Sequence, residues 1–297
     1  MKPESVLIIG GGTMGRGIAS VCAIAGYPTL LFEADAGTRG GLRDAIESSW
    51  QRAVQKGKIS AEAVSRAAGR LVILKELAPP PDLAFALEAV PESLELKLRI
   101  FEQLERLTPA SAVLASNTSS LSIAAIAGAT RSPARVIGIH FFNPPAAMPL
   151  VEIVCSRETS PETAAKAHQF VSALGKTAIR VADSPGFATS RLGVALGLEA
   201  MRMLEEGVAS APDIDRAMEL GYGHRMGPLM TSDLVGLDVR LSIAEALAAE
   251  LDAARFAPPP ILRRLVAQGN LGKKAGRGFY RWNGDEAVEV STVRGKS

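Results

Sequence analysis

The stretch "SVLIIGGGTMGRGIA", residues 5–19, decides the fold. Ser5–Ile9 is an apolar run of strand length, and glycines follow it at positions 10, 12 and 15 before a helical apolar spacing begins. Glycines with this spacing permit a tight turn, close approach of the backbone to a pyrophosphate, and close packing of the helix on the strand. The stretch therefore predicts a strand, a phosphate-binding turn and a helix.

The residues that carry this binding prediction are Gly10, Gly12 and Gly15, with Thr13 and Met14 between the last two. Glu33 ends the next predicted strand, 18 residues after Gly15, where a carboxylate can accept hydrogen bonds from a ribose. Such a carboxylate repels a 2′-phosphate, so we expect NAD rather than NADP, although Arg39 lies nearby in the sequence. The alternative is a simple glycine turn with a solvated acid at the strand end.

Composition narrows the class of protein. The chain has 297 residues with 47% hydrophobic content, enough for one large domain or two unequal ones. Its 33 basic and 31 acidic residues nearly cancel, which argues against nucleic acid and anionic membranes as partners. No apolar stretch approaches the roughly 20 residues of a membrane span, so we expect a cytoplasmic protein. Cys22 and Cys155 have no metal-ligand spacing, so no metal site is expected and both should be reduced.

The first half alternates apolar runs with amphipathic segments, which is typical of parallel strands joined by helices. The expected strands are Ser5–Ile9, Thr29–Glu33, Leu71–Leu74, Phe85–Val90, Ala112–Ala115, Val136–Ile139, Val151–Val154 and Ala178–Val181. The expected helices are Met14–Ala25, Gly41–Lys56 and Leu94–Leu107.

From Ala188 onward the apolar spacing is almost entirely helical, for example in "GVALGLEAMRMLEEG", "APDIDRAMEL", "VRLSIAEALAAEL" and "PPILRRLVAQG". This change predicts a domain boundary near Asp183. We expect an α/β protein with a Rossmann-type, mostly parallel sheet domain at residues 1–183 that binds NAD. An all-α C-terminal domain is expected at residues 184–297.

Several motifs together carry a family resemblance. They are "GGGTMGRGIA", "EAVPESLELK", "SNTSSLSI", "HFFNPPAAMPLVE", "PGFATSR", "EEGVAS", "MGP", "VGLD" and "GKKAGRGFY", in order from about residue 5 to 281. The chain resembles the L-3-hydroxyacyl-CoA dehydrogenases, which include the 3-hydroxybutyryl-CoA dehydrogenases. The resemblance implies reversible hydride transfer between NAD and carbon 3 of an (S)-3-hydroxyacyl-CoA of short to medium chain, such as 3-hydroxybutyryl-CoA. It also implies an active site between two domains and a homodimer formed through the C-terminal one.

His140 is the candidate base. Oxidation of a secondary alcohol needs a group that takes the hydroxyl proton, and imidazole can accept and return one near neutral pH. His140 follows a predicted strand, and Glu152 lies 12 residues on, in the next predicted strand, where it could fold back against the ring. A carboxylate there would fix the tautomer of the ring, and the resemblance implies these two roles. The other histidines, His168 and His224, lack this context.

The resemblance implies further contacts, each with a structural alternative. Ser119 matches a serine near the nicotinamide and the substrate hydroxyl, and its alternative is a helix cap. Asn143 matches a cofactor contact, and it could be a turn residue. Glu92 and Lys97 also match cofactor contacts, and they could be a helix-start carboxylate and a solvated lysine. Lys274 matches another, with an exposed lysine as its alternative.

For the acyl-CoA substrate, Ser49 and Lys56 match the family's contacts, with Arg52 and Lys58 nearby. A solvated helix face would explain these four residues almost as well. Ser190 stands where many relatives have an asparagine that contacts substrate, and it offers a hydroxyl in place of an amide.

A second departure is Arg225, at a position where proline is common.

Two other functions remain open. One is a sugar-acid dehydrogenase of the gulonate type, which shares the fold and the histidine, although "HFFNP" favours the acyl-CoA enzymes. The other is a non-catalytic NAD-binding protein on the same scaffold.

Overall fold

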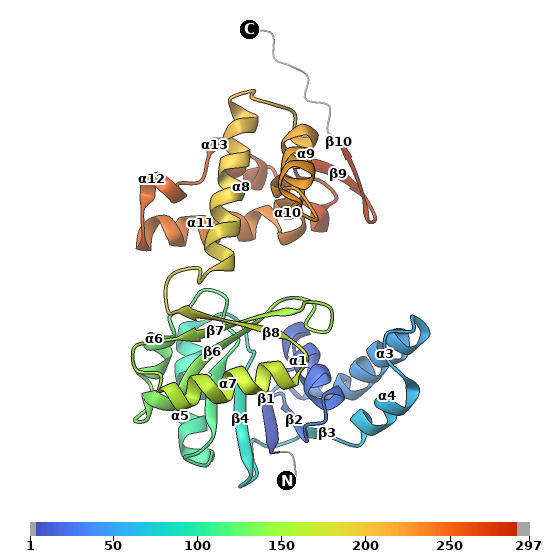
Figure 1. Cartoon of the computed structure of the whole chain (residues 1–297), viewed down its shortest axis with the longest axis vertical. Coiled ribbons are helices and arrows are strands. Elements are labelled where there is room, and N and C mark those ends of the chain that lie inside the picture. Colours follow the sequence, from blue (N-terminus) through green and yellow to red (C-terminus); the bar gives the residue numbers. More distant parts are fainter. Residues whose placement is uncertain (1–3, 290–297) are drawn as a thin grey trace. The chain divides into compact units, whose positions relative to one another are not determined.

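The computed structural model describes residues 4–289 of the chain (Figure 1). These residues fall into two compact units, one that ends at Ser184 and one that begins at Pro185. The change of sequence pattern expected at Asp183 lies beside this division. The ends of the two predicted domains, residues 1–3 and 290–297, lie outside the described residues.

One eight-stranded sheet forms the centre of the first unit. Its strands are β1 (Ser5–Ile9), β2 (Thr29–Phe32), β3 (Leu71–Leu74), β4 (Leu83–Glu88), β5 (Val113–Ser116), β6 (Val136–Phe141), β7 (Leu150–Cys155) and β8 (Thr177–Ala182). The order is β3-β2-β1-β4-β5-β6-β7-β8, and the first six strands are parallel. Strand β7 runs antiparallel to β6, and β8 runs parallel to β7. The predicted Rossmann-type, mostly parallel sheet is therefore confirmed.

The helices of this unit connect the strands (Figure 1). They are α1 (Thr13–Ile24), α2 (Ala36–Gly40), α3 (Leu42–Gln55), α4 (Ala61–Ala68), α5 (Leu94–Leu107), α6 (Ile123–Ala127), the short 3₁₀ helix η1 (Pro133–Arg135) and α7 (Pro161–Ala173). The sequence analysis predicted α1, α3 and α5. Helix α7 was missed, although Ser160 caps it and Pro161 stands at its first position, which are both helix-start signals.

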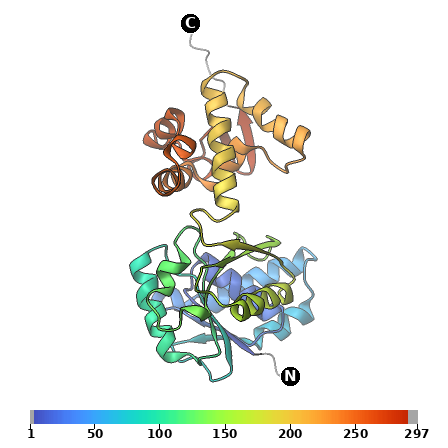
Figure 2. The ribbon, with the colours of Figure 1, turned by 60° about the vertical axis from the view of Figure 1, so that its left-hand side comes forward.

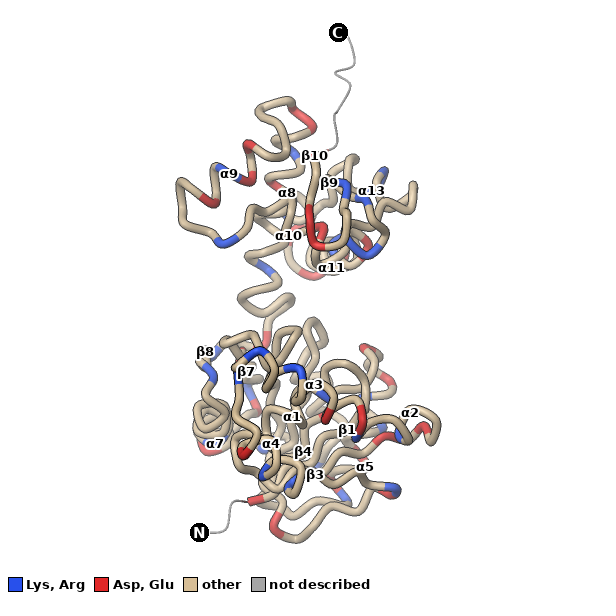
Figure 3. The backbone as a smooth tube through the Cα atoms, turned by 90° about the vertical axis from the view of Figure 1, so that its right-hand side faces the viewer, with Lys and Arg blue, Asp and Glu red and all other residues tan. Residues whose placement is uncertain are grey.

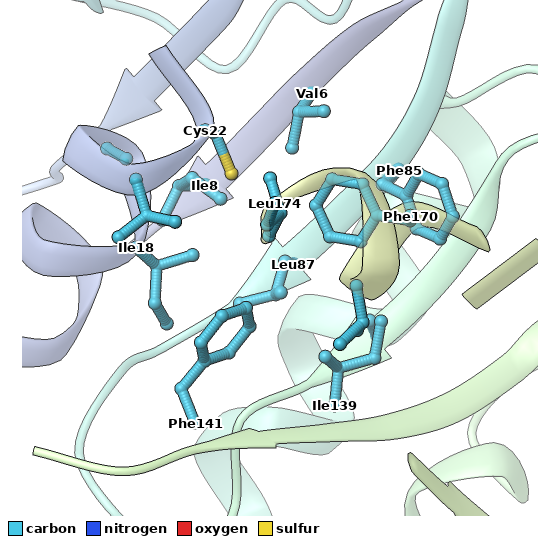
Figure 4. Close-up of a cluster of buried hydrophobic side chains, with 14 of the residues drawn as sticks. Val6, Ile8, Ile18, Cys22, Phe85, Leu87, Ile139, Phe141, Phe170 and Leu174 are labelled. Atoms are coloured by element: carbon cyan, nitrogen blue, oxygen red, sulfur yellow. The ribbon is translucent and has the colours of Figure 1, made fainter. Parts of the chain in front are cut away.

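The core of the first unit lies where α1 and α7 cover the sheet. Figure 4 shows Val6 and Ile8 of β1, Ile18 and Cys22 of α1, and Phe85 and Leu87 of β4 among its buried side chains. Phe85 stacks on Phe170 of α7 with ring centroids 4.4 Å apart.

Both cysteines are buried and free, as predicted. Burial raises the pKa of the Cys22 thiol to about 12, so this side chain behaves as a small apolar core residue.

The second unit is helical, as expected, with one addition. Its helices are α8 (Thr189–Glu205), α9 (Ala211–Tyr222), α10 (Pro228–Val235), α11 (Leu237–Glu250), α12 (Ala253–Phe256), α13 (Pro260–Ala267) and the 3₁₀ helix η2 (Lys273–Ala275). Figure 2 shows α8 in yellow with other helices of the unit around it. A hairpin of β9 (Tyr280–Asn283) and β10 (Glu286–Glu289) was not predicted. The all-α expectation overlooked the Gly284–Asp285 pair between the two strands, which is a hairpin turn signal.

Two buried aspartates tie this hairpin to the helices. Asp233 of α10 accepts hydrogen bonds from the backbone of Phe279 and Tyr280 and from Nε1 of Trp282. Asp215 of α9 accepts one from the Tyr280 hydroxyl, at 2.6 Å. Burial raises the pKa of both carboxyl groups, against the opposing effect of these donors. The hairpin is thus part of the unit's core rather than an appendage.

Charged residues of both signs are distributed along the backbone of both units (Figure 3). Within residues 4–289, no helix is long and apolar enough to cross a membrane. The same residues contain no group of three or more potential ligands that could hold a metal ion.

The close packing of α1 on β1 can be tested with a matched pair of glycine variants. In Gly15→Ala, the new Cβ would lie 1.8 Å from the carbonyl oxygen of Gly10, so we expect the free energy of unfolding to fall by at least about 2 kcal/mol. In Gly12→Ala, the Cβ meets nothing within 4 Å, so we expect a change within about 1 kcal/mol. Urea unfolding followed by circular dichroism measures both, and equal stability of the two variants would contradict the argument.

Candidate active site

The candidate site lies at the carboxyl ends of the strands of the first unit. The strand order reverses between β1 and β4, and open α/β sheets bind ligands at this point. The segments that follow β1, β4, β5 and β6 carry several of the predicted site residues. They are the glycine loop 10–12, residues 89–92, residues 117–119 and residues 142–149.

The glycine loop has the geometry that a pyrophosphate needs. A side chain on Gly10 would collide with the backbone of Ala89, and one on Gly15 with Gly10 itself, so both positions require glycine. Gly12 and Thr13 are exposed, and no side chain caps the first turn of α1. The N–H groups of this turn can therefore bind an anion, so these residues fit the diphosphate of NAD.

Glu33 lies beside the same loop. Its carboxylate accepts hydrogen bonds from the backbone N–H of Gly11 at 2.7 Å and of Asp35 at 2.9 Å. Each oxygen keeps a further lone pair, so the carboxylate can also accept from ribose hydroxyls. The guanidinium of Arg39 donates to the backbone oxygen of Glu33 at 2.8 Å, which holds it against the chain.

His140 and Glu152 are direct partners across β6 and β7. Nδ1 of His140 lies 2.8 Å from Oε2 of Glu152, and the contact predicted from the sequence is therefore present. The histidine is 7% exposed and the glutamate is fully buried. The sequence analysis expected His140 after the strand, but the residue lies within β6, because the hydrogen-bonded register with β7 extends the strand to Phe141.

Lys97 is not the solvated lysine that was considered as an alternative. Its Nζ lies 2.6 Å from Oε1 of Glu88 and 3.3 Å from Oε2 of Glu92, and the side chain is 1% exposed. Glu88 is fully buried at the end of β4 and also accepts a hydrogen bond from the Ser116 hydroxyl at 2.7 Å. This ion pair joins α5 to the carboxyl ends of β4 and β5.

Glu92, which contacts Lys97, also contacts the segment that carries Ser119. Its backbone N–H donates to Oε1 of Glu92 at 3.1 Å, and the hydroxyls of Thr118 and Ser120 donate to the same oxygen. Partial burial would raise the pKa of Glu92, but these donors and the charge of Lys97 hold it below its ordinary value. Ser119 is not the cap of α6, because Ser122 fills that role.

Some of the residues predicted to contact coenzyme A lie together in the structure. A hollow of about 460 Å³ is lined by Thr13, Asn143, Ser49 and Arg52, together with Arg16 of α1. Asn143 thus lines the same hollow as Thr13, which follows the glycine loop. Lys56 is exposed at the end of α3 and does not line this hollow.

The other candidates lie in the second unit. Lys274 forms an ion pair with Asp238, with Nζ 2.7 Å from Oδ2, and half of its side chain is exposed. Ser190 is in the first turn of α8, and Arg225 is an exposed residue before α10. None of these observations tests their predicted roles toward cofactor or substrate.

Two residues of this region were missed from the sequence. Arg16 follows Gly15 directly, and its position in the first turn of the predicted helix was the available signal. Glu88 is a single carboxylate in the apolar run "LAFALEAV", and such a residue at a strand end indicates a buried polar role.

Comparisons with known proteins identify the family of this chain. Residues 5–184 match the family model described as 3-hydroxyacyl-CoA dehydrogenase, NAD binding domain. Residues 186–282 match the model described as 3-hydroxyacyl-CoA dehydrogenase, C-terminal domain. The chain belongs to the 3-hydroxyacyl-CoA dehydrogenase family. The predicted family and its class of NAD-dependent oxidoreductase are therefore confirmed.

Individual members of the family are similar over nearly the whole chain. A 3-hydroxybutyryl-CoA dehydrogenase of Mycobacterium tuberculosis is 44% identical over 282 residues, which cover 94% of this chain and 98% of the relative. The mitochondrial hydroxyacyl-coenzyme A dehydrogenase of Homo sapiens is 38% identical, over 94% of this chain and 91% of the relative. The crystal structure of (S)-3-hydroxybutyryl-CoA dehydrogenase from Ralstonia eutropha has a TM-score of 0.90 at 35% identity, covering 95% of this chain and 100% of that one.

The buried ion pair of Lys97 generates a stability prediction. In Lys97→Met, the fully buried Glu88 loses its cation, so we expect the free energy of unfolding to fall by about 3–5 kcal/mol. The matched control is Arg99→Met on the same helix, where the pair with Glu95 is exposed and the expected loss is below about 0.5 kcal/mol. The double variant Glu88→Gln/Lys97→Met should recover much of the loss. Urea unfolding measures the stability of all three variants. A Lys97→Met protein as stable as the Arg99→Met protein would refute this role of the ion pair.

Proposed function

We propose that this chain catalyses the reversible NAD-dependent oxidation of (S)-3-hydroxyacyl-CoA thioesters of short to medium chain, such as 3-hydroxybutyryl-CoA, to 3-oxoacyl-CoA. The observation that carries the proposal is the buried contact of 2.8 Å between His140 and Glu152 at the carboxyl end of the sheet. The printed names of the M. tuberculosis and R. eutropha relatives support the short acyl group.

The chemistry that bound NAD would supply is the acceptance of a hydride from carbon 3 of the substrate. His140 takes the hydroxyl proton at Nε2, because its other ring nitrogen, Nδ1, faces Glu152. The carboxylate of Glu152 accepts a hydrogen bond from Nδ1–H, which fixes the tautomer and stabilises the imidazolium that forms. In the reverse direction His140 returns the proton to the oxygen of the 3-oxoacyl group.

Ser119 orients the reacting oxygen. Its hydroxyl is a short donor on the segment after β5, and Glu92 holds the backbone of this segment through the N–H of Ser119. Glu92 in turn is held by Lys97. We assign Glu92 and Lys97, with Asn143, to the cofactor side of the site, and Lys274 of the second unit remains a proposed cofactor contact.

The hollow beside α1 suits the charged part of coenzyme A. Arg16 and Arg52 line it, and guanidinium groups bind phosphates well. Ser49 offers a hydroxyl in the same hollow. Lys56, which follows α3 one turn after Arg52, is proposed as a further cation for the substrate, and Ser190 is proposed to contact the acyl part.

Nothing in the geometry favours the two other functions. A sugar acid needs no hollow with two arginines, and a non-catalytic protein needs no buried histidine–glutamate pair. These functions are therefore left as outcomes of the assay below.

Two further assignments complete the proposal. A homodimer through the second unit is supported by large apolar side chains that are exposed there, with Leu192, Leu220 and Tyr222 all more than two-thirds exposed. A cytoplasmic location is supported by the two free cysteines. The preference for NAD over NADP rests on the Glu33 carboxylate.

The cofactor preference can be tested at Glu33. In Glu33→Gln, the side chain keeps a hydrogen-bond acceptor but loses its charge, so we expect the KM for NAD to rise about tenfold and discrimination against NADP to fall by a similar factor. Steady-state kinetics with both cofactors measure this change. Glu47→Gln on the surface of α3 is the control, and an unchanged ratio of NAD to NADP activity in Glu33→Gln would refute the assignment.

The reaction is tested by NADH oxidation with acetoacetyl-CoA, with a sugar acid assayed in parallel. We expect turnover of the thioester, and no turnover of any 3-oxoacyl-CoA would overturn the proposal. In His140→Gln, kcat should fall about 10²- to 10⁴-fold while NADH binding is kept, because the base is lost. The matched control His168→Gln changes an exposed histidine of α7 and should leave kcat unchanged. A His140→Gln enzyme as fast as wild type would support a non-catalytic role for this residue.

A further inference from the structure

Lys176 binds the backbone of the loop between β6 and β7. The residue lies directly before β8, and its Nζ donates to the carbonyl oxygens of Pro145 at 2.7 Å, Met148 at 2.9 Å and Ala146 at 3.5 Å. An ammonium group has three donors and no acceptor, so it matches three oxygens that face one point. Within residues 4–289, no other donor contacts these three oxygens.

The loop has few backbone donors of its own. Pro144 and Pro145 have no backbone N–H. The N–H groups of Ala147 and Met148 both donate to the oxygen of Pro144, which forms a turn. The remaining carbonyl oxygens of the turn therefore need donors from elsewhere, and Lys176 supplies them.

The sheet fixes the other end of this contact. Thr177, the residue after Lys176, donates its N–H to the oxygen of Pro149 at 2.8 Å. Strand β8 then continues in register with β7 from Leu150 onward. The side chain of Lys176 thus joins a fixed point of the sheet to the loop. Its contacts are to backbone oxygens, which any loop sequence supplies.

The loop that Lys176 binds is one wall of the hollow beside α1. Residues 143–146 line this hollow together with Arg16 and Arg52. Pro145 also packs on α1, where a Cβ atom built on Gly17 would lie 2.8 Å from two atoms of the proline ring. A shift of the loop would therefore change the shape of the hollow. Lys176 does not line the hollow itself, so it can affect a ligand there only through the loop.

We propose that Lys176 is a positioning residue that fixes the loop wall of this hollow and thereby sets the affinity for the nucleotide part of coenzyme A. This inference rests on the proposed function, in which the hollow takes the charged part of the coenzyme. The register of the sheet, and not the loop, holds His140 against Glu152. Loss of the Lys176 contact therefore weakens binding of the coenzyme and leaves proton transfer intact.

The test compares acetoacetyl-CoA with acetoacetyl-pantetheine, which carries the same acyl group without the nucleotide, at saturating NADH. In Lys176→Met, we expect the KM for acetoacetyl-CoA to rise at least about tenfold and kcat to change less than about threefold. The value of kcat/KM for acetoacetyl-pantetheine should change less than about threefold, because this thioester has no group for the hollow.

The matched control is Lys166→Met on α7. It removes an exposed lysine whose Nζ also donates to a backbone oxygen, that of Ser111 at 3.2 Å, away from the hollow. This variant should keep the wild-type constants for both thioesters. The ratio of the two thioesters within one preparation corrects for any loss of folded enzyme.

A chemical rescue separates the charge of Lys176 from its packing. In Lys176→Cys, the KM for acetoacetyl-CoA should rise as in Lys176→Met. Alkylation with 2-bromoethylamine then places an ammonium group at nearly the length of lysine, and it should return this KM to within about threefold of wild type. Cys22 and Cys155 are buried, and wild-type enzyme treated with the same reagent is the control.

Three results would overturn this inference and leave the proposed function intact. They are a wild-type KM for acetoacetyl-CoA in Lys176→Met, equal losses of kcat/KM for both thioesters, and a raised KM that persists after alkylation confirmed by mass spectrometry. Turnover of neither thioester by the wild-type enzyme would overturn the proposed function itself.

Discussion

The first unit depends on one close contact between backbones. Helix α1 lies so near the end of β1 that no side chain fits between Gly15 and the carbonyl oxygen of Gly10. The backbone of Ala89, after β4, likewise leaves no room for a side chain on Gly10. This packing directs the first turn of α1 and its N–H groups toward the loop. It also brings Gly11 within 2.7 Å of the Glu33 carboxylate at the end of β2. A phosphate site and a ribose site thus result from the same packing requirement.

Much of the fold could be predicted from the sequence because parallel strands buried on both faces read as short apolar runs. All eight strands of the large sheet were expected, with β1 and β3 at their observed bounds and the others displaced at their ends by one or two residues. Strand ends depend on the register with neighbours, which the sequence of one strand does not contain, and His140 was placed after β6 for this reason. The hairpin β9–β10 has a local turn signal that was overlooked, but its attachment to the helices depends on Asp233, which is distant in sequence.

The same distinction holds for the site. The glycine loop and the pair of His140 and Glu152 carry local signals that a single sequence shows. Lys97 of helix α5 carries no such local signal. It is buried because it pairs with Glu88 on strand β4, and an amphipathic helix pattern alone predicts that a lysine is exposed. Buried charges in this protein become interpretable only when their partners are known, and these partners lie on other elements in most cases.

The reversed direction of β7 has a consequence for how this enzyme can vary. His140 and Glu152 face each other as cross-strand neighbours, so the hydrogen bonds of the sheet set their separation and the connecting segment 142–149 does not. Outside Asn143, that segment can lengthen or change composition while the pair persists. A shift of one residue within β7 would instead turn Glu152 to the opposite face of the sheet. Evolution can therefore remodel the rim of the site through a tolerant loop, while the proton-transfer pair is inherited with the register of the sheet.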